Sequence, residues 1–158
     1  MSTRSIIIRK NEEGKYESIY CHWDGYPTCN GVILYNHYNN PERVKKLISL
    51  GDLSSLNVFI EPDNRAEEKH TFDNPQPNTC VFYGRDRGED INVDFRTFDN
   101  LLEVLKQDCW QEYAYVYEDG VWYMWDYRFD LPSGVNIIDL EVLSYVLEQE
   151  KDNIKIRQ

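Results

Sequence analysis

The sequence predicts a single α+β domain, in which a mainly antiparallel sheet built from hairpins packs with three to four helices. Three patterns support this fold class: short runs rich in β-branched and aromatic residues, turn signals between pairs of such runs, and helical periodicities between the hairpins. The length of 158 residues fits one domain, 1–158, and 41% hydrophobic with 28% charged residues is an ordinary globular composition.

The first hairpin is expected at the N-terminal end of the sequence. Residues 3–10 include three consecutive isoleucines, and residues 16–23 are rich in aromatic and β-branched side chains. A polar Asn-Glu-Glu-Gly-Lys segment joins them, and its glycine can adopt the positive φ that a tight turn requires. The Gly25-Tyr26-Pro27 triplet then ends the second strand.

Two short helices are expected next. Residues 31–38 have apolar side chains at near-helical spacing. The second helix should begin at Asn40-Pro41, because Asn is a favoured N-cap and Pro is favoured in the first turn. It should end at Gly51, since glycine accepts the left-handed conformation that terminates many helices.

Residues 61–78 are expected to form a long exposed loop. The segment contains three of the six prolines together with many Asp, Asn and Glu residues. It is therefore the segment that we expect to be mobile or to contact a partner.

A second hairpin and a third helix are expected after this loop. Residues 80–83 form a short apolar run, and residues 91–95 alternate between apolar and polar side chains. A turn at 85–90 would join these two strands. Thr97 would then cap a helix that covers 98–105 and packs its apolar stripe on the sheet.

The clearest hairpin signal lies at 110–127, where Asp119-Gly120 forms a two-residue turn signal between aromatic-rich strands. Alternation by residue number would place the odd-numbered aromatic residues on one face and Trp122 with Met124 on the other. One face is expected to be sheet core, and the other is left open as a platform for bases or partner side chains. The last helix is expected over 139–151.

The chain is acidic, with 28 Asp and Glu against 17 Lys and Arg, a net charge of -11 and a sequence pI near 4.7. Such a protein repels phosphate backbones and has no basic run, so a general DNA- or RNA-binding role is excluded. The acidic residues are distributed over the chain, which predicts a folded acidic face and a basic protein as its partner. The expected contact residues are Glu61, Asp63, Glu67, Glu68, Asp73, Glu89 and Asp90.

The four cysteines, Cys21, Cys29, Cys80 and Cys109, include no close pair, and the first residues lack the pattern of a signal peptide. We therefore expect reduced thiols and a cytoplasmic location. The apolar runs are too short for a membrane span. Cys21 and His22 would point to opposite faces of a strand, so neither a metal ion nor another cofactor is expected.

The densest group of chemically active side chains lies at 20–27. Strand alternation would place Tyr20, His22 and Asp24 on one face, where they could form a site. The structural alternative is that Trp23 belongs to the core while Asp24 accepts backbone N–H groups and holds the turn.

Arg4 is the second unusual residue, because strand alternation places it on the same apolar face as Ile6. A guanidinium in such a place needs a partner, since an unpaired buried charge is costly. We expect Arg4 either to pair with Asp24 across the first hairpin or to meet an anionic ligand beside Tyr20 and His22.

Two short motifs carry a resemblance: Ser2-Thr3-Arg4-Ser5 before an apolar strand, and Trp23-Asp24-Gly25-Tyr26-Pro27 after the second strand. On these residues the chain resembles a family of small phage, prophage and bacterial proteins, over roughly its first third. The resemblance implies that Arg4 and the Trp-Asp-Gly-Tyr-Pro residues occupy signature positions. It also implies that His22 stands where other members often carry a glutamine, which argues against a catalytic histidine.

By analogy, small acidic proteins in a phage setting are often host-takeover or counter-defence factors, anti-CRISPR proteins among them. The leading expectation is therefore an inhibitor that acts in the host cytosol and binds a basic host defence protein, such as a nuclease, through its acidic surface. The alternative is a protein that binds or sequesters a nucleotide signal in a pocket at the first hairpin. The binding residues would be Arg4, Tyr20, His22, Trp23, Asp24 and Tyr26.

Enzymatic activity is not expected. The sequence contains no nucleophile elbow, no phosphate-binding loop and no dinucleotide fingerprint. A hydrolase that uses Asp24 and His22 is the third hypothesis, because neither residue has a partner network in the sequence.

Overall fold

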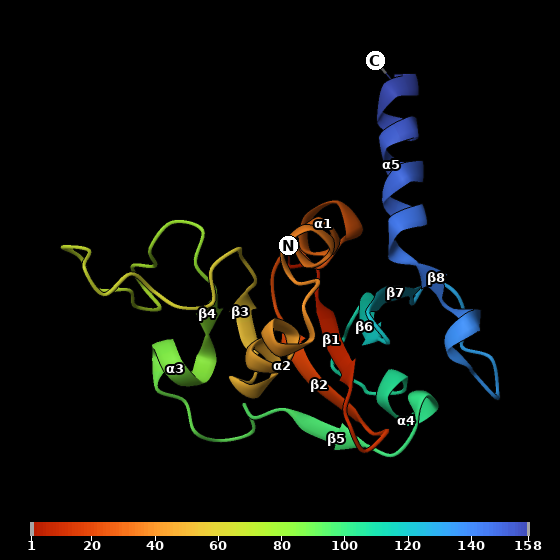
Figure 1. The fold of residues 1–158 in the computed structure, drawn as a ribbon, viewed down its shortest axis with the longest axis horizontal. Helices are drawn as coiled ribbons and strands as arrows, with labels where there is room; N and C mark the ends of the chain where they lie inside the picture. Colours follow the sequence, from red (N-terminus) through yellow and green to blue (C-terminus); the bar gives the residue numbers. More distant parts are fainter. Residues whose placement is uncertain (1, 158) are drawn as a thin grey trace.

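The computed structural model describes residues 2–157, with side chains through residue 151. These residues form one mixed, mostly antiparallel sheet of eight strands with five α-helices (Figure 1), which confirms the predicted α+β class. The strand order is β4-β3-β2-β1-β6-β7-β8, and β5 pairs with a second stretch of β2. No helix in the described part of the chain is both long and apolar enough to cross a membrane.

The first hairpin forms as predicted. Strand β1 (Ser5–Lys10) pairs antiparallel with β2 (Tyr16–Cys21). In the connecting turn the Asn11 side chain accepts hydrogen bonds from the backbone N–H groups of Glu13 and Lys15, at 3.0 and 2.9 Å. The turn is therefore stabilised by an asparagine that satisfies its own backbone.

The aromatic hairpin also forms as predicted, from β6 (Tyr113–Glu118) and β7 (Val121–Asp126). Asp119 and Gly120 both have positive φ, 51° and 79°, as a two-residue hairpin turn requires. Strand β6 pairs with β1 in parallel, so the sheet is mixed where the two hairpins meet.

The assignment of aromatic residues to faces by odd and even number is wrong. Tyr117 lies opposite Trp122, and Tyr115 lies opposite Met124. Directly opposed residues share a face, so the two-residue turn exchanges odd and even numbers between the strands. Tyr123 and the other odd-numbered aromatic residues of β7 therefore face the opposite side, and both faces of this hairpin contribute to cores.

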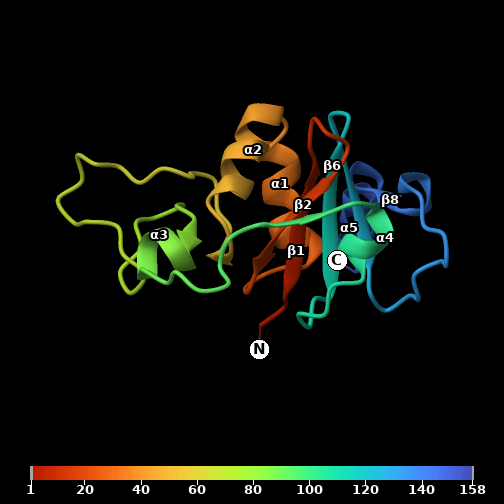
Figure 2. The ribbon, with the colours of Figure 1, turned by 90° about the horizontal axis from the view of Figure 1, so that it is seen from below.

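Both faces of the sheet are covered (Figures 1 and 2). One face carries Ile7, Ile19 and Tyr115 and packs against three helices. These helices are α1 (Val32–His37), which follows a π-helical turn at Pro27–Gly31, α2 (Pro41–Ser49) and α5 (Leu143–Arg157). The opposite face carries Ile6 and Ile8 and packs against α4 (Leu101–Leu105).

The two predicted helices after the first hairpin are present as α1 and α2. The Asn40 side chain caps α2 by accepting the N–H of Glu42 at 2.9 Å, and Pro41 occupies its first turn. Gly51 has φ +84°, and a Cβ at this position would collide with the carbonyl oxygen of Val93. The predicted stop therefore has both a conformational and a steric cause.

The second predicted hairpin is wrong. Residues expected to form its turn lie instead in α3 (Tyr83–Arg87), which ends at Gly88 in the left-handed conformation. Strand β4 (Val81–Phe82) pairs with β3 (Leu53–Ser55), while the next strand, β5 (Arg96–Phe98), pairs with β2. The expected strand at 91–95 is not a strand: its Val93 carbonyl accepts the Asp52 N–H at 2.7 Å, and sheet pairing starts only at Arg96.

The third helix starts later than predicted. Thr97 lies in β5, and the cap of α4 is Asn100, whose side chain accepts the N–H of Glu103 at 2.9 Å. An asparagine directly before a leucine-rich turn is the stronger N-cap signal, since Asn caps at least as well as Thr.

The last helix also begins later than predicted. A short 3₁₀ turn (Ile137–Asp139) and strand β8 (Glu141–Val142) precede α5. The 3₁₀ turn is held by a reciprocal capping box, in which Asn136 and Asp139 each bind the other's backbone. Pairing of Glu141 with Met124 of β7 then keeps the chain extended until the helix starts.

Residues 61–78 contain no helix or strand, and most of them are exposed. The loop projects from the end of the sheet that carries β4 (Figures 1 and 2, yellow to green). Together with β4 and α3 it forms an extension that we call the acidic lobe, residues 61–90.

Candidate functional site

Arg4 and Tyr20 line the same cavity, a space of about 580 Å³ that also contacts Arg96, Gln107 and Trp110. We call this cavity the Arg4–Arg96 pocket. It lies on the sheet face that packs against α4, and its residues come from five separate stretches of the chain. The other members of the predicted first-hairpin site do not line it.

Sheet pairing places these side chains together. Tyr20 of β2 lies opposite Ile6 of β1, so it shares a face with Ile6 and, by alternation, with Arg4. Strand β5 joins the free stretch of β2 and brings Arg96 beside it, opposite Ser18. The segment after α4 supplies Gln107, whose amide donates to the Ser18 hydroxyl at 2.8 Å.

Arg96 is held by Asp52. The guanidinium Nη1 and Nη2 atoms donate to Oδ1 and Oδ2 of Asp52 at 3.1 and 2.9 Å, and Oδ1 also accepts the backbone N–H of Tyr20 at 2.8 Å. The hydrogen bonds to Asp52 raise the pKa of Arg96. Arg96 is thus oriented by a bidentate pair that compensates its charge.

Arg4 has no ion pair among the described residues. The expected pair with Asp24 is therefore wrong. Asp24 is exposed, has φ +59°, and uses its backbone carbonyl to accept the N–H of Asn30 at 3.0 Å. Arg4 is half-buried at the pocket with an uncompensated charge.

His22 contacts Tyr20, with 2.7 Å between the Tyr20 hydroxyl oxygen and His22 Nδ1. Burial raises the pKa of Tyr20, whereas burial and the Arg4 charge lower the pKa of His22. At neutral pH both groups are therefore neutral, and the direction of the hydrogen bond between them follows the His22 tautomer. His22 orients Tyr20 and forms no hydrogen bond with Asp24 within the described structure.

Trp23 and Tyr26 lie outside the pocket and are exposed, at 43% and 40%. The interpretation of Trp23 as core is wrong: its ring packs edge-on against His22, with 4.7 Å between ring centroids. Neither residue lines the pocket beside Arg4.

The Ser2–Ser5 segment and the Trp-Asp-Gly-Tyr-Pro segment contact each other. Gly25 donates its backbone N–H to the Thr3 carbonyl at 2.8 Å and accepts the Tyr115 hydroxyl at 2.6 Å. A Cβ on Gly25 would lie 2.8 Å from Ser5 Cβ and from the Thr3 carbonyl oxygen, so only glycine fits there. The Trp-Asp-Gly-Tyr-Pro motif therefore positions the residues on both sides of Arg4.

Sequence reasoning missed Asp52, Arg96, Gln107 and Trp110. Trp110 had the clearest signal, because an indole in a polar stretch before a strand lacks an obvious packing partner. In the structure it is 79% exposed with φ +63°. The other three residues carry no local signal, since their role depends on contacts between distant segments.

The seven acidic residues predicted to contact a partner all lie in the acidic lobe. The lobe contains eight Asp and Glu against four Lys and Arg. Phe72 of the loop packs on Tyr83 of α3, with ring centroids 5.7 Å apart, and Glu89 follows directly after α3. The structure thus gathers these residues at one end of the molecule (Figure 2).

A buried network holds the lobe in place. His70 Nε2 lies 3.2 Å from Asp86 Oδ2 and 3.0 Å from the Cys80 carbonyl oxygen, and His70 Nδ1 accepts the N–H of Gln76 at 2.9 Å. Asp86 also accepts the N–H of Phe82 at 2.8 Å. The acidic loop is therefore tied to β4 and α3 at several points.

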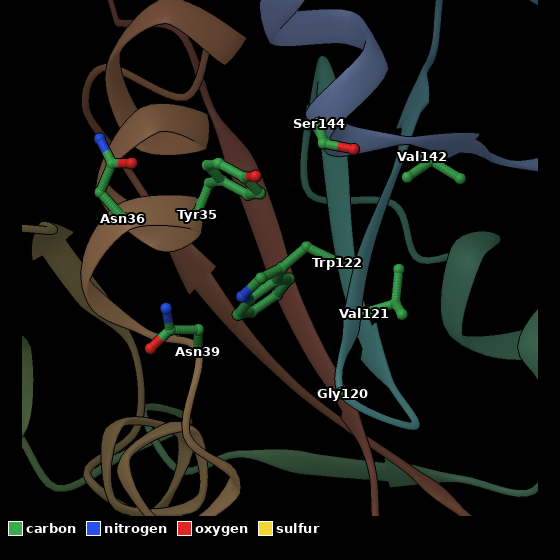
Figure 3. Close-up of a pocket in the computed structure, with 8 residues that line it drawn as sticks. All are labelled: Tyr35, Asn36, Asn39, Gly120, Val121, Trp122, Val142 and Ser144. Atoms are coloured by element: carbon green, nitrogen blue, oxygen red, sulfur yellow. The ribbon is translucent and has the colours of Figure 1, made fainter.

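A second cleft, of about 370 Å³, lies between α1 and the β7–β8 region (Figure 3). Tyr35 and Asn39 line one side, and Trp122, Val142 and Ser144 line the other. No charged side chain and none of the predicted site residues lines it. It lacks the convergence of charged groups that distinguishes the Arg4–Arg96 pocket.

Within the described residues, no group of three His, Cys, Asp or Glu side chains is placed to hold a metal ion. The cysteines are free thiols, and burial raises the pKa of Cys21 to about 12. A thiol with this pKa is protonated at neutral pH and is a poor nucleophile.

No family model matches the chain, and no match is found among curated proteins or solved structures.

Proposed function

We propose that this protein binds and sequesters a small anionic molecule in the Arg4–Arg96 pocket. The observation that carries the proposal is the uncompensated Arg4 guanidinium at the cavity. The Arg4 guanidinium forms no ion pair within the described structure, so its charge is available to an anionic ligand in a protein of net charge -11.

The pocket is also preorganised for such a ligand. Asp52 holds Arg96 before any ligand arrives, so ordering this side chain adds little to the cost of binding. The planar fork of Arg4 suits phosphate or carboxylate oxygens, whereas the fork of Arg96 is already bound by Asp52. Asp108 also lines the cavity, but it is exposed and its charge is screened by water.

Calorimetric titration with inorganic phosphate, pyrophosphate, glycerol 3-phosphate, citrate and nucleotides tests this proposal. We expect at least one anion to bind, and Arg4→Ala to weaken its affinity about tenfold or more. Arg65→Ala is the matched control, because it removes an exposed cation from the acidic lobe and leaves the pocket intact. Equal binding by Arg4→Ala and by the unaltered protein would refute the proposal.

The second candidate is the counter-defence function, in which the acidic lobe binds a basic protein. The gathering of seven acidic residues on a lobe tied by the His70–Asp86 network favours it, because an ordered charged surface loses less entropy on binding than a flexible loop. The resemblance to phage proteins adds an analogy: the partner would be a host nuclease or another nucleic-acid-binding defence protein.

Affinity capture from a bacterial lysate at low and high salt tests this candidate. We expect to capture a basic nucleic-acid-binding protein at low salt and not at high salt. The variant that combines Glu67→Gln, Glu68→Gln and Asp73→Asn should fail to capture it even at low salt. Arg4→Ala is the matched control, since it lies outside the lobe and should retain the partner. Capture that is independent of salt and of the three substitutions would contradict this function.

A further inference from the structure

We infer that the ligand of the Arg4–Arg96 pocket is a nucleoside monophosphate, with its phosphate at Arg4 and its base against Trp110. This inference rests on the proposed anion-binding function and extends it to a ligand class. Three observations carry it: the cavity's size, the conformation and exposure of Trp110, and the acceptor groups beside the arginines.

The cavity is too large for a simple anion. Its volume of about 580 Å³ falls in the range of pockets for organic ligands of moderate size, about 300 to 1,000 Å³. A phosphate ion at Arg4 would occupy a small part of this space, and the aromatic surface around it would stay in contact with water. The ligand therefore has an organic part beside its anionic group.

Trp110 identifies the organic part as a flat ring. Its φ of +63° is unfavourable for a residue with a side chain, and 79% of its surface is exposed although it lines the cavity. The neighbouring chain holds it there: the Cys109 N–H donates to Gln111 Oε1 at 3.0 Å, and the Glu112 N–H donates to the Arg4 carbonyl at 2.8 Å. An indole presented in this way is a stacking surface for a base.

The remaining groups require a ligand that also donates hydrogen bonds. The Gln107 amide nitrogen already donates to the Ser18 hydroxyl at 2.8 Å and to the Val104 carbonyl at 2.9 Å, which leaves its amide oxygen as the acceptor. The carboxylate of Asp108 is a second acceptor at the exposed side of the cavity. Ribose hydroxyls and base amino groups donate to such acceptors.

The charge balance favours one phosphate over three. Arg96 is compensated by Asp52, so Arg4 is the cation left for the ligand. Additional phosphates would approach the carboxylates of Asp52 and Asp108 without a further free cation in the pocket. A monophosphate should therefore bind more tightly than the matching triphosphate.

Isothermal titration of the full chain with the four nucleoside 5′-monophosphates tests the inference. The tightest of them should bind with a Kd below about 1 mM, and more tightly than its nucleoside, its triphosphate or inorganic phosphate. Trp110→Ala should weaken its binding about tenfold and leave the affinity for inorganic phosphate unchanged. Phe129→Ala is the matched control, because it removes another exposed aromatic residue outside the pocket.

The outcomes separate this inference from the proposal on which it rests. Arg4-dependent binding of phosphate or glycerol 3-phosphate, with no nucleotide bound more tightly, would overturn the nucleotide inference and leave the anion-binding function in place. Failure of every anion to bind would overturn both. Trp110→Phe keeps an aromatic ring and should therefore retain most of the nucleotide affinity. If urea unfolding shows that Trp110→Phe and Trp110→Ala are both folded, an equal loss of affinity in the two variants would count against stacking.

Discussion

The Arg4–Arg96 pocket and the acidic lobe are built on the same local arrangement, a buried aspartate that accepts a backbone N–H and binds an arginine. In the pocket Asp52 binds the Tyr20 N–H and Arg96; in the lobe Asp86 binds the Phe82 N–H and Arg85. The two regions differ in the charges left over. The pocket retains a free cation, Arg4, whereas the lobe retains a surplus of exposed carboxylates.

In both regions the aspartate–arginine pair therefore fixes the positions of the side chains. The residues around the pair decide whether the surface left for binding is positively or negatively charged. The two aspartates are similarly buried, with side-chain exposures of 4% for Asp86 and 8% for Asp52, but their partners differ: His70 is 1% and Arg85 22% exposed, whereas Arg96 is 40% exposed. Removal of the two aspartates should therefore have unequal costs.

Asp86→Ala should have the largest effect on stability. It would leave the Phe82 N–H, His70 and Arg85 without their shared acceptor, at a cost of about 3 kcal/mol in the free energy of unfolding. Urea unfolding measures this loss, and limited proteolysis should show faster cleavage within 61–78. Asp73→Asn, an exposed change in the same lobe, is the control; a loss below about 1 kcal/mol for Asp86→Ala would show that the network does not hold the loop.

Asp52→Ala should lower the free energy of unfolding by less than Asp86→Ala, about 2 kcal/mol, because water can solvate the Arg96 side chain that the substitution releases. The same urea unfolding experiment measures the change, with Asp108→Ala as the control at an exposed carboxylate of the same cavity. A loss greater than that of Asp86→Ala would reverse the order of the two regions and contradict the burial argument.

Protonation of His22 should change the free energy of unfolding by less than either aspartate substitution. Its pKa is lowered in the folded protein by burial and by Arg4, so below the ordinary value of 6.5 the unfolded chain binds more protons than the folded one. Stability should therefore fall as the pH drops through 6.5 and level off below the folded pKa. His22→Gln should flatten this part of the curve.

Titration of His22 by NMR connects this effect to the pocket. An anion bound at Arg4 offsets one of the two causes of the lowered pKa, so saturation with the ligand should raise the pKa of His22. Arg4→Ala should raise it without ligand. A pKa that rises in Arg4→Ala but stays unchanged on saturation with the ligand would place the anion away from Arg4.

The smallest effect is expected at the surface of the acidic lobe. Glu67→Gln combined with Asp73→Asn should change the free energy of unfolding by no more than about 0.5 kcal/mol, because both side chains are exposed and outside the His70–Asp86 network. The same urea experiment measures it. A larger loss would mean that these carboxylates serve the fold rather than a binding surface.

Local sequence rules predicted much of the fold. Asp119-Gly120 and Asn40-Pro41 act through the conformations of adjacent residues, and both gave the correct hairpin and helix. The segment 91–95 has the right alternation, but sheet pairing begins only at Arg96, and Ile91 is 76% exposed. Pairing partners cannot be recognised from alternation alone, so β5 was placed too early in the chain.

The sequence by itself determined that Arg4 lies on an apolar face beside Tyr20, because alternation along a strand is a property of the backbone. It also determined that the acidic residues spread over the folded chain. Only the tertiary structure decided which arginine is neutralised: Asp52 reaches Arg96 and leaves Arg4 free at a cavity with Gln107 and Trp110. The reason is physical, since ion pairing depends on distances of about 3 Å in space, whereas the sequence records only order along the chain.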